Sequence, residues 1–270
     1  MRIHSTFTKA LAVSAVALMS LTACGGSDGG ADAPAATGAG SDLGLVQAGT
    51  LTVCSDIPYK PFEYEENGKY VGFDMDLVGA IAKAMDLKLE VKDVGFDGLQ
   101  SGVVLASGQC DMGASAMTIT DDRKKHLGFT DGYYDSEQSL LVPKDSDIKS
   151  IDDLAGKTVG VQQGTTGKKY ATEHVPSDTK IQDYPSDAEL FPALQSKGVD
   201  AVLQDLPVNL EHTQDGKFKI VAKYKTDEQY GFAVKKDGTE ALLKELDAKL
   251  AELKDNGQYQ EIYDKYFSTK

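Results

Sequence analysis

Residues 188–205 read AELFPALQSKGVDAVLQD and contain, in this order, a helical segment, a glycine and a short apolar strand. The helix is expected over residues 188–196, the strand is Ala201–Leu203, and Asp205 follows the strand closely. A weaker copy of this pattern lies earlier in the chain, where GLQS at residues 98–101 leads through a glycine to CDMG at residues 110–113. On its own, the repeat is best explained as a chance likeness between two α/β units.

Strands and helices alternate along the rest of the chain. The expected elements are strands at 51–54, 87–91, 111–115, 139–142, 158–161 and 230–234, a hairpin at 63–71, and helices at 74–85, 96–105, 121–127, 167–173 and 238–267. This alternation predicts parallel sheets covered on both faces. The order restarts near residue 140, which together with the repeat predicts two similar lobes. We expect the strand at 230–234 to return the chain to the first lobe, so that two crossings form a hinge.

The N-terminus predicts export. A polar, positively charged start precedes an apolar run at residues 10–18, which is shorter than the roughly 20 residues of a transmembrane helix. Residues 1–23 therefore fit a secretory signal peptide. The following LTAC at residues 21–24 resembles a bacterial lipobox, in which cleavage leaves Cys24 as the lipidated first residue. The alternative is a plain signal peptide with an incidental cysteine.

Residues 24–44 are predicted to be a flexible tether from the lipidated cysteine, because small and polar residues predominate there and cannot bury a core. A lipid would hold the domain on the membrane without spanning it. The whole chain has 28 basic and 42 acidic residues, a formal net charge of −14. Such a surface repels nucleic acid, so we expect no nucleic-acid partner; solubility is the ordinary explanation of the acidity.

Catalytic and metal-binding patterns are missing from the sequence. The four histidines are scattered without metal-ligand spacing, and GTTGKK at residues 164–169 lacks the spacing of a phosphate-binding loop. We therefore predict no catalytic residue, no metal and no cofactor. Cys54 and Cys110 could form a disulfide in an exported protein. Their expected places at opposite ends of parallel strands favour two buried free thiols instead.

Two segments that run from a strand to a helix suit a ligand carboxylate. The Gly164–Gly167 segment presents backbone N–H groups at a helix start, although Thr165 could serve only as an ordinary cap. Arg123 is expected in a first helical turn, which is unfavourable for a cation because the N-terminus is the positive end of the helix dipole. Its guanidinium could be reserved for a ligand anion, which it would bind through two hydrogen bonds. The alternative is a solvated surface arginine.

Two further candidates lie at predicted carboxyl ends of strands, where ligands of open α/β sheets collect. Asp205 suits an ammonium group, with a helix N-cap before Pro207 as the alternative. Residues 56–62, DIPYKPF, offer a carboxylate and aromatic faces after the first strand. A loop held by its prolines is the alternative for that segment.

Taken together, these segments resemble the polar amino-acid family of ABC-transporter substrate-binding proteins, solute-binding protein family 3. The resemblance covers about residues 45–268 and is most similar to glutamine-binding and lysine/arginine/histidine-binding members. It is carried by DIPYKPF at 56–62, GFDMDL at 72–77, MTITDDR at 117–123, FTDGYY at 129–134, VQQGTT at 161–166, DAVLQD at 200–205 and NGQY at 256–259.

The resemblance implies an α/β, two-lobed periplasmic-binding-protein fold, each lobe a mainly parallel sheet flanked by helices. Residues 45–138 and 229–270 would form lobe 1, and residues 139–228 lobe 2, joined by a two-strand hinge. The implied function is that of an extracytoplasmic, lipid-anchored and monomeric receptor, which binds a free polar amino acid and delivers it to an ABC permease. A cyclic-acid dehydratase on the same fold, or a module that presents ligand to a sensor kinase, are the alternatives.

The resemblance also implies a role for each site residue. Arg123 would bind the ligand α-carboxylate with help from Thr118 and Thr165, and Asp205 would hold the α-ammonium. Further contacts are implied for Ser115, the backbone of Ala116, the aromatic pair Tyr59 and Phe96 around the ligand side chain, and Asp56 near its tip. Gln162 is also expected to contact the ligand. Ala116 and Gln162 depart from the glycine and lysine common in glutamine binders, and residues 103–109 form a longer segment than usual, so these positions do not define the specificity. Asp56 and the aromatic pair favour a cationic or amide side chain, and we expect arginine, lysine, glutamine or histidine as ligand.

Overall fold

The computed structural model describes residues 43–268; the predicted signal peptide, Cys24 and nearly all of the tether lie outside this range. The first sheet has the order β4 (Lys88–Asp93), β1 (Thr50–Ser55), β5 (Met112–Gly113), β12 (Ala233–Lys235) and β6 (Leu127–Phe129). The second has the order β11 (Phe218–Tyr230), β7 (Tyr134–Pro143), β10 (Ala201–Asp205), β8 (Thr158–Gln162) and β9 (Lys180–Tyr184). The hairpin of β2 (Tyr64–Glu66) and β3 (Lys69–Val71) turns at Asn67-Gly68, as expected. The predicted α/β fold with two lobes is confirmed.

Both sheets are mixed rather than mainly parallel. In the first sheet β1 is parallel to β4 and β5, whereas β12 is antiparallel to β5 and β6. In the second, β8 is parallel to β9 and β10, whereas β7 is antiparallel to β10 and β11. The antiparallel pairings involve the segments near the two crossings. The chain enters the second sheet at β7 and returns to the first at β12, as predicted.

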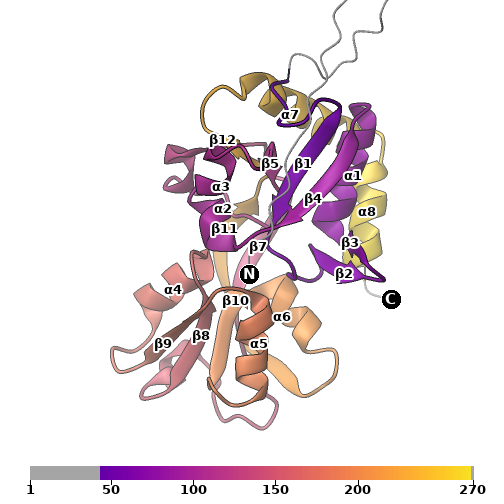
Figure 1. Cartoon of the computed structure of the whole chain (residues 1–270). Helices are drawn as coiled ribbons and strands as arrows, with labels where there is room; N and C mark the ends of the chain where they lie inside the picture. Colours follow the sequence, from indigo (N-terminus) through magenta and orange to yellow (C-terminus); the bar gives the residue numbers. More distant parts are fainter. Residues whose placement is uncertain (1–42, 269–270) are drawn as a thin grey trace, which may run out of the picture. The chain divides into compact units, whose positions relative to one another are not determined.

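Helices cover both faces of each sheet (Figure 1). The first sheet carries α1 (Phe73–Ala84), α7 (Glu240–Asp255) and α8 (Gln258–Phe267) against one core cluster, and α2 (Phe96–Gln100) and α3 (Val103–Ala106) against another. The second sheet carries α4 (Thr166–His174), α5 (Asp187–Gln195) and α6 (Leu206–His212). Neighbouring residues of a strand face opposite sides. Accordingly, Leu140 of β7 belongs to the same core cluster as Ala171 of α4, and Leu141 to that of Leu190 in α5.

Some predicted elements are shorter or broken. The helix expected at residues 96–105 is two helices, because Gly102 adopts a left-handed conformation (φ 79°) that glycine tolerates at little cost. The helix expected at 121–127 is only a 3-10 turn at Arg123–Lys125, which Thr120 begins by accepting a hydrogen bond from the Arg123 N–H at 3.1 Å. A further 3-10 turn spans Ile151–Leu154. Over residues 43–268, no helix combines the length and apolar character needed to cross a membrane.

Cys54 and Cys110 form a disulfide, with their Cα atoms 5.8 Å apart, so the expectation of two free thiols is wrong. The strand expected at 111–115 is only Met112–Gly113, and it pairs with Val53 and Cys54. Cys110 therefore lies in the turn just before β5 and not at the far end of a long strand. Both cysteines are buried in the core cluster that α2 and α3 help to form.

We predict that the Cys54→Ala/Cys110→Ala double variant loses about 2–4 kcal/mol of unfolding free energy, because the bridge closes a loop between residues separated by 56 positions. Urea unfolding of both proteins with and without reductant measures this. Reductant should lower the stability of the wild type to that of the variant and leave the variant unchanged. Equal stability of the oxidised wild type and the variant would contradict the prediction.

Candidate functional site

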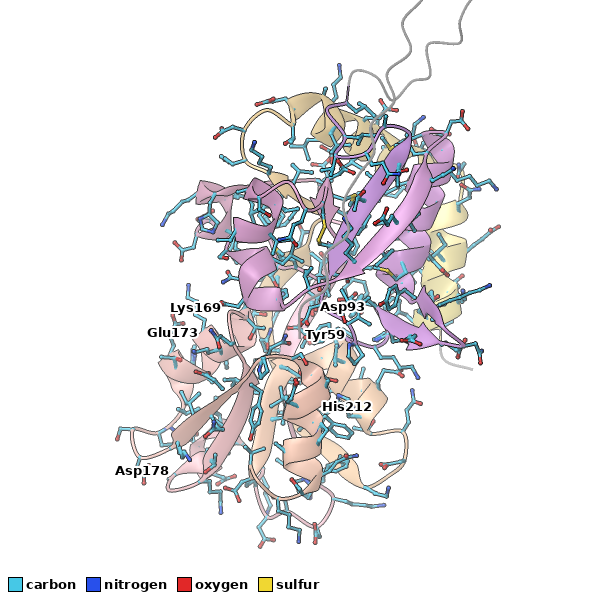
Figure 2. The ribbon with its side chains drawn as sticks, viewed as in Figure 1. Tyr59, Asp93, Lys169, Glu173, Asp178 and His212 are labelled. Atoms are coloured by element: carbon cyan, nitrogen blue, oxygen red, sulfur yellow. A yellow bond between two sulfur atoms is a disulfide. The ribbon has the colours of Figure 1, made fainter. Side chains whose placement is uncertain are left out.

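All residues predicted for the ligand site line one cavity. Its lining consists of Asp56, Tyr59, Phe96, Ser115, Ala116, Thr118, Arg123, Gln162, Thr165, Thr166 and Asp205. The cavity volume is only about 20 Å³, little more than a single water molecule needs. Figure 2 shows Tyr59 between the strands of the first sheet and the helices of the second. The cavity is therefore closed around its own side chains, and a ligand the size of an amino acid requires these groups to separate.

Arg123 is the buried cation of the cavity. Its side chain is enclosed, with the residue only 4% exposed, so it is not a solvated surface arginine. The guanidinium donates to the carbonyl oxygens of Thr118 (2.7 Å) and Gly164 (2.9 Å) and lies 5.2 Å from the ring centre of Phe96. Burial lowers the pKa of Arg123 to about 10, which leaves it charged at neutral pH. A charged guanidinium that donates to two carbonyl oxygens can replace one of these hydrogen bonds by a stronger one to a ligand carboxylate.

Asp205 is the last residue of β10, and its carboxylate accepts three side-chain hydrogen bonds. The donors are the hydroxyls of Tyr59 (2.9 Å) and Tyr230 (2.5 Å) and the amide of Gln138 (2.5 Å). Although Asp205 occupies the N-cap position of α6, its side chain makes no capping hydrogen bond within the described part of the chain. Burial raises the pKa of Asp205, partly offset by these donors and by Arg123. Its carboxylate thus faces the cavity and can accept an ammonium group.

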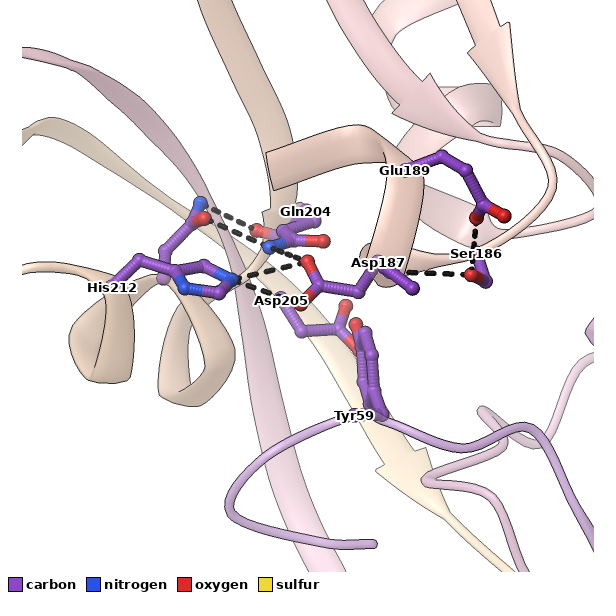
Figure 3. Close-up of polar contacts among 9 residues, drawn as sticks. Tyr59, Ser186, Asp187, Glu189, Gln204, Asp205 and His212 are labelled. Carbon is purple, nitrogen blue, oxygen red and sulfur yellow. Dashed lines mark hydrogen bonds and ion pairs between the residues drawn. The ribbon is translucent and has the colours of Figure 1, made fainter. Parts of the chain in front are cut away.

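A buried polar network supports the segment that carries Asp205 (Figure 3). The Gln204 amide donates to Asp187 and to Asn209, both at 3.1 Å, and a ring nitrogen of His212 lies 3.0 Å from Asp187. This network joins the end of β10 to the start of α5 and to the middle and end of α6. It therefore fixes the backbone on the side of Asp205 that faces away from Tyr59.

Asp56 lies at another place in the cavity, where its main partner is Gln162. The Gln162 amide donates to the Asp56 carboxylate at 2.5 Å and to the Pro185 carbonyl at 3.1 Å. Burial raises the pKa of Asp56 to about 7, and neighbouring acidic groups add to the rise. A cationic group beside Asp56 would favour the ionised carboxylate.

Two fully buried carboxyls hold the loop that contains Ser115 and Ala116, and sequence reasoning did not identify them. Glu63 accepts from the Ser115 hydroxyl at 3.0 Å, and Asp74 accepts from the Ala116 N–H (2.9 Å) and the Tyr133 hydroxyl (2.7 Å). Ala116 has φ 44°, a conformation that a non-glycine residue adopts at some cost. Burial raises the pKa of Glu63, and raises that of Asp74 to about 7. The two acids therefore hold a strained backbone at the edge of the cavity.

The start of α4 forms another part of the wall. The Thr165 hydroxyl accepts from the Lys168 N–H at 3.1 Å, so it is the ordinary cap that the sequence allowed, and it also lines the cavity. In the first turn of α4, a Cβ at Gly167 would lie 2.9 Å from the amide oxygen of Gln138. The absence of a side chain at Gly167 therefore lets α4 approach the hinge strand β7 closely.

The residues that sequence reasoning missed come mainly from the hinge strands. Gln138 and Tyr230 bind Asp205, and Glu228 accepts hydrogen bonds from Thr118 and Thr166. The sequence marks residues 138 and 228 only as expected boundaries between the lobes. The available signal was one polar residue at each expected crossing between the lobes, Gln138 and Glu228. Polar side chains at such a crossing can face the cleft.

Comparison with known proteins supports one family. The sequence model of the family described as "bacterial extracellular solute-binding proteins, family 3" matches residues 51–269. A probable histidine-binding protein of Neisseria gonorrhoeae is 36% identical over 99% of this chain and 97% of its own length. An arginine-binding extracellular protein of Bacillus subtilis is 33% identical over 96% of both. A structure of an ancestral arginine-binding protein bound to arginine is 40% identical over 82% of this chain and 99% of its own, with a TM-score of 0.77. A structure of an ancestral arginine-binding protein bound to glutamine is 39% identical over 83% of this chain and 100% of its own, also with a TM-score of 0.77.

We predict that the unliganded protein becomes less stable as pH rises from 5 to 8. A folded-state pKa raised to about 7 for Asp74 gives stability that is complete below the unfolded pKa and lost as pH passes 7. Asp74→Asn keeps an oxygen for Ala116 and Tyr133 but cannot ionise, so it should flatten the fall by roughly 2 kcal/mol. Thermal unfolding across this pH range tests it. If the variant had the same pH dependence as the wild type, Asp74 would not be the group that causes the loss of stability.

Proposed function

Because the chain belongs to the bacterial extracellular solute-binding proteins of family 3, we propose that its cavity binds one free polar amino acid for delivery to an ABC importer. The observation that carries this proposal is the pairing of two opposite charges in one closed cavity. Arg123 comes from the segment between β5 and β6 of the first sheet, and Asp205 from β10 of the second. The carboxylate and ammonium of an α-amino acid match these charges in sign.

Binding in this arrangement is coupled to closure of the lobes, because the ligand bridges Arg123 and Asp205. Two hydrogen bonds already connect these charges across the lobes. The Gly164 carbonyl accepts from Arg123, and the Tyr59 hydroxyl donates to Asp205. We propose that the ligand carboxylate replaces the Gly164 carbonyl and that the ligand ammonium competes with Tyr59 for Asp205.

The ligand side chain would lie between Tyr59 and Phe96 with its tip near Asp56. A carboxylate at the tip favours a cationic or amide side chain over an acidic one. The relatives named for histidine and arginine, and the ancestral arginine-binding proteins solved with arginine and with glutamine, fit this range. We therefore propose arginine, lysine, glutamine or histidine as the ligand, with the cationic amino acids favoured.

We further propose that Cys24 carries a lipid that holds a monomeric receptor on the outer face of the cytoplasmic membrane. The support is the LTAC motif after an apolar run and before a tether of small residues. The dehydratase alternative needs a general acid placed at a leaving group. We assign Asp56 and Asp205 to ligand binding instead, so the proposal includes no catalysis.

We predict that one or a few polar amino acids raise the unfolding free energy by about 2.7 kcal/mol at a hundredfold excess over their Kd. Thermal-shift measurements against the twenty amino acids identify them. Arg123→Ala and Asp205→Ala should abolish the shift. Lys169→Ala and Asp178→Ala, which make the same charge changes at exposed positions labelled in Figure 2, should not. No shift with any amino acid would contradict the proposed function.

We also predict that the affinity for a cationic amino acid rises about tenfold from pH 6 to pH 8. With a pKa of about 7, Asp56 is mostly protonated at pH 6 and ionised at pH 8, and a cation binds the ionised form. Asp56→Asn should remove this dependence and weaken arginine binding more than glutamine binding. Calorimetric titrations at both pH values check this. If Asp56→Asn weakened arginine and glutamine binding equally, Asp56 would not lie beside the ligand side chain.

A further inference from the structure

Glu228 of β11 gathers donors from both lobes and from the other hinge strand. Its Oε2 atom lies 3.2 Å from the hydroxyl of Thr118, 3.2 Å from that of Thr166 and 3.1 Å from the amide nitrogen of Gln138. Thr118 belongs to the first lobe, Thr166 begins α4 of the second, and Gln138 is on β7. One carboxylate oxygen thus connects the parts that must come together when the lobes close.

An irregularity in β11 accompanies this placement of Glu228. Tyr224 pairs with Gln138 and Glu228 with Ser136, so β11 advances four residues where β7 advances two. Within the extra segment Asp227 has φ 51°, and it is exposed, as is Gln229, while Glu228 is partly buried. Bulges of this kind re-aim side chains beside functional sites. Here the bulge accompanies a side chain that reaches the donors at the cleft.

The partners of Glu228 are themselves bonded to the two charges of the ligand site. The fully buried Gln138 amide nitrogen, which donates to Glu228, also donates to Asp205. The Thr118 carbonyl accepts from Arg123, while the Thr118 hydroxyl donates to Glu228. Glu228 is not among the residues that line the ligand cavity. Its hydrogen bonds therefore reach the ligand site through Gln138 and Thr118.

We propose that Glu228 is a positioning residue that stabilises the closed arrangement of the lobes around the ligand. The proposal rests on the amino-acid binding proposed above. Its hydrogen bonds to Thr118 and Thr166 span the cleft, so they form on closure and break on opening. Losing them should speed opening and ligand release and leave ligand entry unchanged. A purely electrostatic role would instead slow the entry of a cationic ligand and make entry more sensitive to salt.

The test is stopped-flow kinetics on the full chain, with whichever amino acid most stabilises the wild type. We compare Glu228→Ala with Glu137→Ala, which removes the same charge from the hinge strand β7. Glu137 is a matched control because it and Glu228 both line one groove on the surface. Glu228→Gln keeps an oxygen that can accept from the threonine hydroxyls. Thermal unfolding without ligand establishes that all variants fold.

We expect Glu228→Ala to raise the dissociation rate about tenfold with an association rate within twofold of the wild type. Glu137→Ala should change neither rate, and Glu228→Gln should recover most of the slow dissociation. Equal dissociation rates for the two alanine variants would overturn the proposal. So would a fall in the association rate shared by Glu228→Ala and Glu228→Gln. If the wild type bound no amino acid, the proposed function itself would be refuted. If the wild type bound one and the Glu228 variants released it at the wild-type rate, only the role of Glu228 would be refuted.

Discussion

The buried guanidinium of Arg123 is the constraint on which the arrangement of the cavity depends. A charge removed from water needs compensation, and here two carbonyl oxygens and the face of Phe96 supply part of it. One of those carbonyls belongs to Gly164 in the other lobe, so compensation of this charge already draws the lobes together. A ligand carboxylate would compensate the charge more fully, which makes closure favourable when ligand is present.

Three carboxyl groups lie in or beside the cavity that holds Arg123. Asp56 and Asp205 are buried, Glu228 is partly buried, and burial raises the pKa of each. Their hydrogen-bond partners are neutral amides and hydroxyls, which stabilise a carboxylate less than a cation does. An amino acid that brings a positive charge therefore supplies what the cavity lacks. The same reasoning explains why a cationic ligand is favoured over an acidic one.

The sequence predicted most of the fold and of the cavity lining because both depend on local patterns. Apolar periodicity identified the strands and helices, and strand ends identified Asp56, Arg123 and Asp205. The misses depend on tertiary register. Nothing local in the sequence reveals that β5 is only two residues long, which brings Cys110 to Cys54. Likewise, Glu228 reaches Thr118 only through a bulge and a contact across 110 positions.

The most direct test of the central claim is a crystal structure of the protein with the bound amino acid. The account predicts the α-carboxylate within hydrogen-bonding distance of the Arg123 guanidinium and the α-ammonium within the same distance of the Asp205 carboxylate. The Arg123 contact to the Gly164 carbonyl should be replaced by the ligand. An amino acid bound outside this cavity, or one whose carboxylate and ammonium contact neither Arg123 nor Asp205, would contradict the account.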